Sequence, residues 1–139
     1  MKGIYVLLIS VAKDIRISIG SLGSLDFPNG LYVYVGSAQN NMEKRVKRHL
    51  RKTKRKFWHI DYLLSNRHAK VLRVFYREAG KIEECRVAEK LFEVTTPIRG
   101  FGSSDCTCKS HLFRIETHDY LNEFTRKAEL KPLAGWSQG

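Results

Sequence analysis

The chain has 139 residues, of which 42% are hydrophobic and 28% are charged. This length suits one compact domain, and the hydrophobic fraction excludes a largely disordered chain. Twenty-five Lys and Arg residues against fourteen Asp and Glu residues give a formal net charge of +11. Such a surplus attracts polyanions, and nucleic acid is favoured over an anionic membrane surface or an acidic protein.

The sequence indicates a cytoplasmic protein. Its three cysteines are too few, and odd in number, for the disulfide scaffold of a secreted domain. The apolar run at residues 4–12 resembles a signal peptide, but Lys13 and Asp14 stand where small cleavage-site residues belong, so a buried strand is the better interpretation. No stretch approaches the roughly 20 apolar residues of a membrane span, and no membrane partner is expected.

The hydrophobic pattern predicts a small α/β domain of the α+β class. Strands are expected where β-branched and aromatic residues dominate or alternate with polar ones, at residues 3–11, 15–19, 31–35, 69–77 and 112–115. Helices are expected where apolar residues recur at helical spacing, from Asn40 or Asn41 to Leu50 and over 57–65, 82–93 and 118–130. Segments 20–30 and 98–109 are expected to be loops. Because the first connections are too short for helical crossovers, the sheet is expected to be mostly antiparallel.

The first expected helix carries most of the net charge. Residues Glu43 to Lys56 contain nine basic side chains and one acidic one. A concentrated patch of this kind is typical of a surface that binds nucleic acid. The basic residues expected to contact nucleic acid are Lys44, Lys47, Arg48, Arg51, Lys52, Lys54, Arg55 and Lys56.

Four residues of the N-terminal half together suggest a phosphate site. Tyr5 lies on the first strand and Tyr34 near the end of the third, so pairing of these strands can bring both phenols to one face. Arg45 and His49 lie one helical turn apart, and a guanidinium group matches phosphate oxygens in a bidentate fork. The alternatives remain open: the tyrosines can be ordinary core residues, and the helical pair can belong to the basic stripe.

Glu89 is the carboxylate that the helical pattern singles out. With Ile82 at 0° and about 100° per residue, Glu89 falls at about 340°, between Ile82 and Cys85. This predicts that it faces the apolar side, where a carboxylate needs a cation. That cation can be a metal ion or the side chain of an Arg or Lys, and both remain open.

The cysteines offer a competing metal set. Cys85, Cys106, Cys108 and His111 can supply the ligands of a Cys₃His zinc site. Structural zinc hairpins usually place roughly two to four residues between paired cysteines, whereas one residue separates Cys106 from Cys108. Zinc is therefore less expected than buried thiols or a disulfide.

These pieces, in this order, resemble the GIY-YIG nuclease superfamily. The matching elements are GIY at Gly3–Tyr5, YVG at Tyr34–Gly36, Arg45 with His49 one turn on, and a helix that carries Glu89. The resemblance implies a metal-dependent endonuclease that hydrolyses phosphodiester bonds, in DNA rather than RNA and possibly in structured or damaged DNA. By likeness, Glu89 binds Mg²⁺ or Mn²⁺, Tyr5 acts as the base or orients water, Tyr34 hydrogen-bonds in the site, Arg45 stabilises charge and His49 assists proton transfer.

The whole chain is similar to a small, largely archaeal branch of that superfamily whose function is unassigned. Segments 58–64 and 101–113 resemble the signatures of this branch, versions of which occur fused to DNA glycosylases. The resemblance implies one domain over residues 1–139, with a core at about 3–93, an extension at about 94–130 and a loose tail at 131–139. It also implies a functional link to DNA repair and to a glycosylase.

One departure from the family pattern leaves a second function open. The family commonly has an Asn soon after its metal-binding Glu, whereas the next Asn after Glu89 is Asn122. The alternative is a nucleic-acid-binding module that keeps the fold without the cleavage chemistry.

Overall fold

The computed structural model describes residues 2–102 and 108–133. Its strands are β1 (Gly3–Val11), β2 (Ile15–Ser18), β3 (Ser24–Phe27), β4 (Gly30–Ala38), β5 (Ala69–Arg77), β6 (Thr96–Pro97), β7 (Leu112–Ile115) and β8 (Lys131–Pro132). Six of them form an antiparallel sheet in the order β6-β7-β4-β1-β5-β8, and β2 and β3 form a separate hairpin. The expected α+β class and antiparallel sheet are confirmed.

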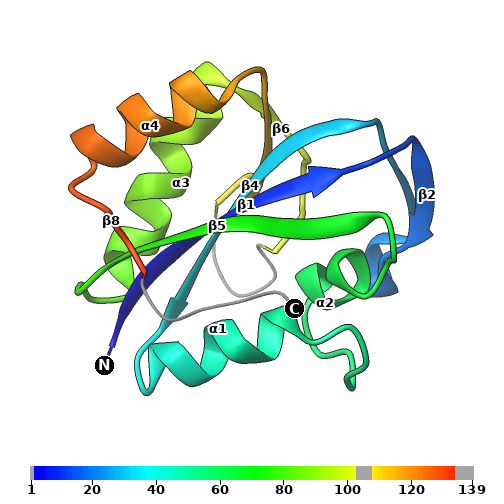
Figure 1. Ribbon diagram of the computed structural model, residues 1–139, viewed down its shortest axis with the longest axis horizontal. Helices are drawn as coiled ribbons and strands as arrows, with labels where there is room; N and C mark the ends of the chain where they lie inside the picture. Colours follow the sequence, from blue (N-terminus) through cyan, green and yellow to red (C-terminus); the bar gives the residue numbers. More distant parts are fainter. Residues whose placement is uncertain (1, 103–107, 134–139) are drawn as a thin grey trace.

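The helices cover both faces of this sheet. They are α1 (Met42–Leu50), α2 (His59–Leu64), α3 (Ile82–Val94) and α4 (His118–Lys127), with a short 3₁₀ helix, η1, at Gly20–Leu22. Figure 1 shows α1 and α2 on one side of the sheet, and α3 and α4 on the other. Among the described residues, no helix combines the length and the apolar character that a membrane crossing needs.

The position of β1 inside the sheet explains why its sequence is almost wholly apolar. Alternate residues from Tyr5 to Val11 pack with the core under α1 and α2. The residues of the opposite face, Ile4, Val6 and Leu8, pack with the core under α3 and α4. Because β1 is buried on both faces, it reads as a continuous hydrophobic run rather than an alternating one.

Local chemistry sets the start of two helices. The side chain of Asn41 accepts a hydrogen bond from the backbone N–H of Lys44 at 3.1 Å, so Asn41, not Asn40, caps α1. A carboxylate oxygen of Asp61 accepts from the backbone N–H groups of Phe57 and Trp58, at 2.8 and 3.0 Å. The second helix therefore begins at His59, two residues later than expected.

Other expectations about the elements were wrong in part. Segment 20–30 contains η1 and β3 as well as turns, because the Ile17–Leu25 pairing makes β3 the partner of β2. The two-residue strands β6 and β8 exist only through pairing with β7 and β5, which no local pattern encodes. The last helix ends at Lys127 rather than residue 130. Within the expected loose tail, residues 131–132 form β8, while residues 134–139 lie outside the described residues.

Candidate active site

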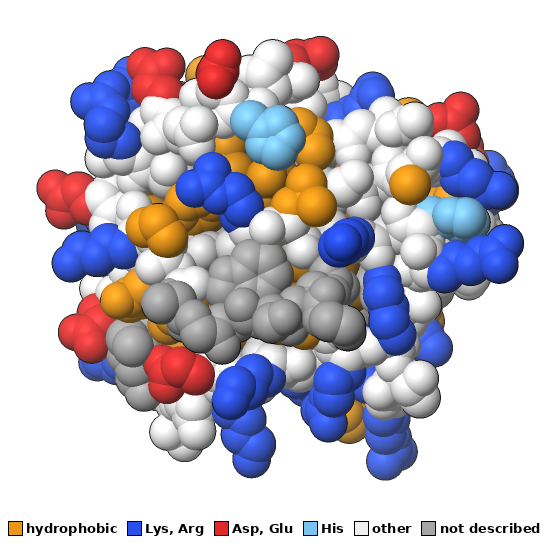
Figure 2. Space-filling view, in the orientation of Figure 1, with side chains coloured by type: hydrophobic (Ala, Val, Ile, Leu, Met, Phe, Trp, Pro, Cys, Tyr) orange, Lys and Arg blue, Asp and Glu red, His pale blue; other side chains and the backbone are white. Residues whose placement is uncertain are grey.

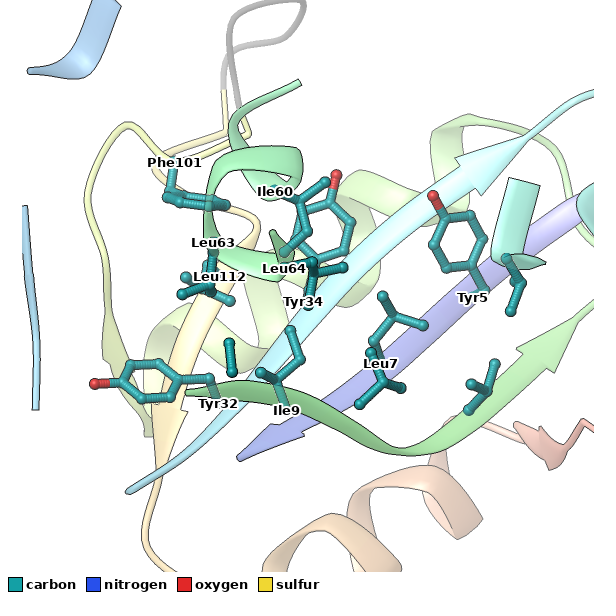
Figure 3. Close-up of a cluster of buried hydrophobic side chains, with 14 of the residues drawn as sticks. Tyr5, Leu7, Ile9, Tyr32, Tyr34, Ile60, Leu63, Leu64, Phe101 and Leu112 are labelled. Carbon is teal, nitrogen blue, oxygen red and sulfur yellow. The ribbon is translucent and has the colours of Figure 1, made fainter. Parts of the chain in front are cut away.

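Strand register brings the two tyrosines of the tripeptides together. Tyr5 on β1 stands opposite Gly36 on β4, and Tyr34 stands opposite Leu7. The two phenols are therefore diagonal neighbours on one face of the sheet. Figure 3 shows both rings rising from that face with their hydroxyl ends pointing the same way. Tyr5 is 1% exposed and Tyr34 is 8% exposed.

Close approach explains the glycine of each tripeptide. A Cβ atom on Gly36 would lie 2.5 Å from Cζ and Oη of Tyr5. A Cβ atom on Gly3 would lie 2.5 Å from the backbone oxygen of Arg77 in the neighbouring strand β5. Both distances are far shorter than a carbon contact, so glycine is required for steric reasons at these positions.

The hydroxyl end of Tyr5 opens onto a pocket with a volume of about 130 Å³. The pocket lies where the end of β4, the first turn of α3 and one side of α1 meet. The side chains in its wall that can act chemically are Tyr5, Tyr34, Ser37, Arg45, Lys81, Glu84 and Cys85, beside the indole of Trp58.

Tyr5 and His49 form a buried hydrogen-bonded pair. The Tyr5 hydroxyl lies 2.7 Å from Nε2 of His49, which is itself 2% exposed. Burial, with a smaller contribution from the charge of Lys54, lowers the pKa of His49 to about 3. Burial also raises the pKa of Tyr5, against the opposing charge of Arg45. Both groups are therefore neutral near pH 7, and Nδ1 of His49 has no hydrogen-bond partner among the described residues.

Arg45 is held at the pocket by an aromatic ring and a carbonyl group. Its guanidinium carbon lies 4.5 Å from the centre of the Trp58 ring, and Nη1 donates to the Ser37 backbone oxygen at 3.1 Å. A guanidinium group has five N–H donors, so further donors remain for a bound anion. Cation–π contact and the carbonyl bond together fix the plane of the group.

Glu84, on the first turn of α3, supplies a carboxylate to the pocket. The Ser37 hydroxyl donates to one carboxylate oxygen, and the other lies 2.8 Å from Nδ1 of His111. Burial opposes ionisation of this group, but the bonds from His111 and Ser37 outweigh it and lower the pKa of Glu84. The pocket therefore contains an ionised carboxylate beside a guanidinium group.

The prediction that Glu89 faces the apolar side of its helix is wrong. Glu89 is exposed, and the pocket wall does not include it. The reference residue of that prediction, Ile82, is 66% exposed, and the buried face of α3 instead contains Val87, Ala88 and Leu91. Relative to Ile82 these three lie at about 140–240°, and Glu84 falls among them at about 200°. The helical pattern thus contained the signal for Glu84, one turn before Val87 and Ala88.

Most basic side chains of the segment are exposed, and three of them are bonded within the protein. Figure 2 shows Lys and Arg side chains along the lower edge of the molecule, where Figure 1 places α1. Six of the eight predicted nucleic-acid contacts are exposed, and apart from Lys52, whose amino group is bonded to backbone carbonyls, they are Lys44, Lys47, Arg51, Arg55 and Lys56. We call these five residues the basic surface.

The other three predicted contacts have structural bonds. Arg48 forms a bidentate ion pair with the buried carboxylate of Asp61, at 2.8 and 2.9 Å. The Nζ atom of Lys52 donates to the backbone oxygens of Leu64 and Asn66, at 3.1 and 3.0 Å, and to that of Ala69. The Nζ atom of Lys54 donates to two carbonyl groups at the end of α1, at 3.1 and 2.9 Å. These three cations stabilise the turn after α1.

Besides Glu84, sequence reasoning missed three residues that shape the site. Asp61 is fully buried and holds both Arg48 and the backbone of Trp58, and Trp58 in turn carries Arg45. Ser37 fixes Glu84 from the end of β4. For Asp61, a signal was present: a carboxylate at the third position of a helix, three residues after the N-cap, is typical of a capping box.

Of the expected Cys₃His set, three members lie together. The ligand atoms of Cys85, Cys108 and His111 all lie within 4.8 Å of one another. His111 is fully buried, and the two cysteines are half-buried. Cys106 lies outside the described residues.

Comparison with known proteins gives one family match. A family model with the description "domain of unknown function DUF123" matches residues 4–131. No curated protein matches the chain, and no solved structure matches it.

Proposed function

The chain belongs to the DUF123 family, and from its pocket we propose that it is a metal-dependent endonuclease that hydrolyses phosphodiester bonds in DNA. The observation that carries this proposal is the meeting of three groups in one pocket. An ionised carboxylate, Glu84, a guanidinium group, Arg45, and the neutral phenol of Tyr5 face the same space of about 130 Å³, and His49 is bonded to that phenol. Phosphodiester hydrolysis needs charge neutralisation and an activated water, and these groups supply both.

The donor set fits a hard divalent cation. Mg²⁺ is bound in proteins through one or two carboxylates together with waters and phosphate oxygens of the substrate. Glu84 is the carboxylate within the described pocket wall, and the hydroxyl-bearing residues Tyr5, Tyr34 and Ser37 line the same pocket. A Mg²⁺ or Mn²⁺ ion held by Glu84 would neutralise charge on a phosphate and lower the pKa of a coordinated water. Glu84 takes the role that the family resemblance assigned to Glu89.

Tyr5 and His49 offer a route for the proton of the attacking water. The Tyr5 oxygen accepts that proton while the hydroxyl proton of Tyr5 passes to Nε2 of His49, 2.7 Å away. Burial disfavours both a free phenolate at Tyr5 and an imidazolium at His49, so neither group keeps the proton and the pair passes it on to the leaving oxygen in the same step.

Arg45 stabilises the charge that develops on the phosphate. Its position over Trp58 and beside the Ser37 carbonyl fixes the guanidinium group before substrate arrives. Donors that are already in place need no reorganisation during the reaction, which is the usual origin of large electrostatic stabilisation.

The basic surface supplies the affinity for the substrate. It lies on α1 and the segment after it, and Arg45 and His49 of the same helix reach the pocket and its Tyr5. Phosphate contacts of this kind position the backbone over the site without reading sequence. The GIY-YIG resemblance favours DNA over RNA, with a role in DNA repair alongside a glycosylase in the cytoplasm.

A second candidate function rests on the bonds of Glu84. Both of its carboxylate oxygens have protein partners, Ser37 and His111. A carboxylate whose two oxygens both have protein partners can serve to hold the end of β4 against α3 as well as to bind a metal ion. The second candidate is therefore a DNA-binding module with the same basic surface and no cleavage.

A cleavage panel at low salt tests the proposal. The purified protein is incubated with duplex, single-stranded, flapped and four-way DNA and with matched RNA, in Mg²⁺, Mn²⁺ or EDTA. We expect metal-dependent cleavage of at least one DNA substrate. Binding to every substrate without cleavage in either metal would overturn the nuclease proposal and favour the binding module.

A further inference from the structure

A second group of ligating side chains adjoins Glu84, which contacts His111 and precedes Cys85 in the sequence. Cys85 follows Glu84 on the first turn of α3, while Cys108 and His111 come from the segment before β7. Their ligand atoms lie within 4.8 Å of one another, although 23 positions of sequence separate Cys85 from Cys108. Two sulfur atoms and one imidazole nitrogen at this separation form a soft donor set, unlike the oxygen donors of the pocket.

The hydrogen bonds of His111 define which ring nitrogen can bind a metal ion. Nδ1 lies 2.8 Å from a carboxylate oxygen of Glu84 and 3.1 Å from the backbone oxygen of Val35. Both neighbours are acceptors, so Nδ1 carries a hydrogen atom, and Nε2 is the nitrogen that would bind a metal ion. A carboxylate behind the imidazole is the usual outer partner of a metal-bound histidine, because it fixes the tautomer and makes the nitrogen more basic.

The backbone around His111 holds the ligand in place before any ion binds. The His111 N–H donates to the Phe101 oxygen at 2.8 Å, and its own oxygen accepts from the Val35 N–H at 2.9 Å. Nearby, the Gly100 N–H donates to the Lys109 oxygen at 2.8 Å. The hydroxyl of Ser110 donates to the Ile98 oxygen at 2.7 Å. Ligands held this firmly lose little entropy on binding.

We propose that Cys85, Cys108 and His111 bind a zinc ion that ties the first turn of α3 to the segment before β7. In a tetrahedral site with Zn–S of about 2.3 Å and Zn–N of about 2.0 Å, neighbouring ligand atoms lie about 3.5–3.8 Å apart. Movements of about 1 Å or less bring ligand atoms that are 4.8 Å apart to this spacing. Zinc takes four ligands, so one further donor completes the site.

This site differs from the one that the sequence suggested. In the sequence, the single residue between Cys106 and Cys108 argued against zinc, because these two cysteines were compared with the paired cysteines of a zinc hairpin. In the structure the cysteines that meet are Cys85 and Cys108, which come from different segments, so spacing within a hairpin is no longer the criterion.

The zinc ion also positions the pocket carboxylate. His111 links the metal to Glu84, and Cys85 is the next residue along α3, so the ion orients Glu84 through both. This consequence rests on the proposed function, whereas the zinc site itself does not. Loss of zinc is therefore expected to lower cleavage more than DNA binding, because the basic surface belongs to α1 and the segment after it.

Metal analysis of the untagged full chain tests the site without any activity assay. Protein from zinc-supplemented medium is dialysed and measured by mass spectrometry of the metal, with cobalt titration as the second readout. We expect one zinc ion per chain and thiolate-to-cobalt absorption. Cys85→Ser, Cys108→Ser and His111→Asn should each reduce bound zinc at least tenfold, while His118→Asn, an exposed histidine on α4, should not.

Wild-type protein without zinc after this preparation would overturn the proposal, and so would a disulfide between Cys85 and Cys108. The wild-type measurement decides even if a variant fails to fold. Tyr5→Phe distinguishes the two proposals, because it changes no zinc ligand and no outer partner of one, so it should keep zinc and lose cleavage. Zinc without cleavage would refute only the nuclease, and cleavage without zinc would refute only the zinc site.

Discussion

Gly36→Ala tests the geometry that joins the sheet to the pocket. The new Cβ would lie 2.5 Å from Cζ and Oη of Tyr5, so either the ring or strand β4 must move. Tyr5 is 1% exposed and its hydroxyl is bonded to His49, which is 2% exposed, so the ring has no space to enter without repacking. The same movement breaks the bond between the Tyr5 hydroxyl and His49.

The expected cost combines two effects. Overpacking a dense core costs about 1–3 kcal/mol, and leaving a buried polar group without its partner costs about 1–3 kcal/mol more. Part of each is recovered by relaxation, so we expect Gly36→Ala to lower the free energy of unfolding by about 2–4 kcal/mol.

Urea unfolding followed by circular dichroism measures this loss. Gly80→Ala is the matched control, because a Cβ atom there has no neighbour within 4 Å. That control should change the free energy of unfolding by at most about 0.5–1 kcal/mol, and it can be stabilising. If Gly36→Ala costs no more than Gly80→Ala, the close approach of Tyr5 to β4 is wrong.

Three further predictions concern the site. Burial lowers the pKa of His49 from 6.5 to about 3, so the unfolded chain binds the extra proton between these pH values. The free energy of unfolding should therefore fall below pH 6.5 by up to about 1.4 kcal/mol per pH unit. His49→Asn should flatten this part of the curve of urea midpoint against pH. If the pH dependence of the variant equals that of wild type, His49 is not its source. Tyr5→Phe should cut DNA about 10²–10⁴-fold more slowly with unchanged binding in a gel-shift titration, and wild-type cleavage would exclude the proton route. Lys47→Ala should reduce the slope of log affinity for DNA against log salt concentration by about one, whereas Lys52→Ala should lower stability and leave this slope unchanged. Equal slopes for the two variants would contradict the division of the basic segment.

Elements with strong local patterns could be predicted from the sequence. Strand β1 is apolar throughout because it is buried on both faces, and the Asn41 cap fixes the start of α1. The tripeptides at Gly3–Tyr5 and Tyr34–Gly36 were interpreted correctly as paired strands, since their register puts both phenols on one face. Periods of two and 3.6 residues carry this information directly.

Features that depend on long-range contacts could not be predicted. The exposed Ile82 at the start of α3 displaced the apolar face in the helical projection, and this placed Glu89 instead of Glu84 on the apolar side. The use of Arg48 as the partner of buried Asp61, 13 positions away, follows from how α1 and α2 pack. Basic residues on a helix look alike in sequence, whether they contact solvent, a carbonyl group or a carboxylate.

The most direct test of the nuclease proposal compares two glutamates of one helix. Glu84→Gln and Glu89→Gln make the same change five positions apart on α3, one in the pocket and one exposed. In single-turnover cleavage of the best DNA substrate with Mg²⁺ or Mn²⁺, we expect Glu84→Gln to be about 10²–10³-fold slower than wild type, with Glu89→Gln unchanged. Equal rates for the two variants, or loss of cleavage in Glu89→Gln alone, would contradict the assignment of the pocket as the active site.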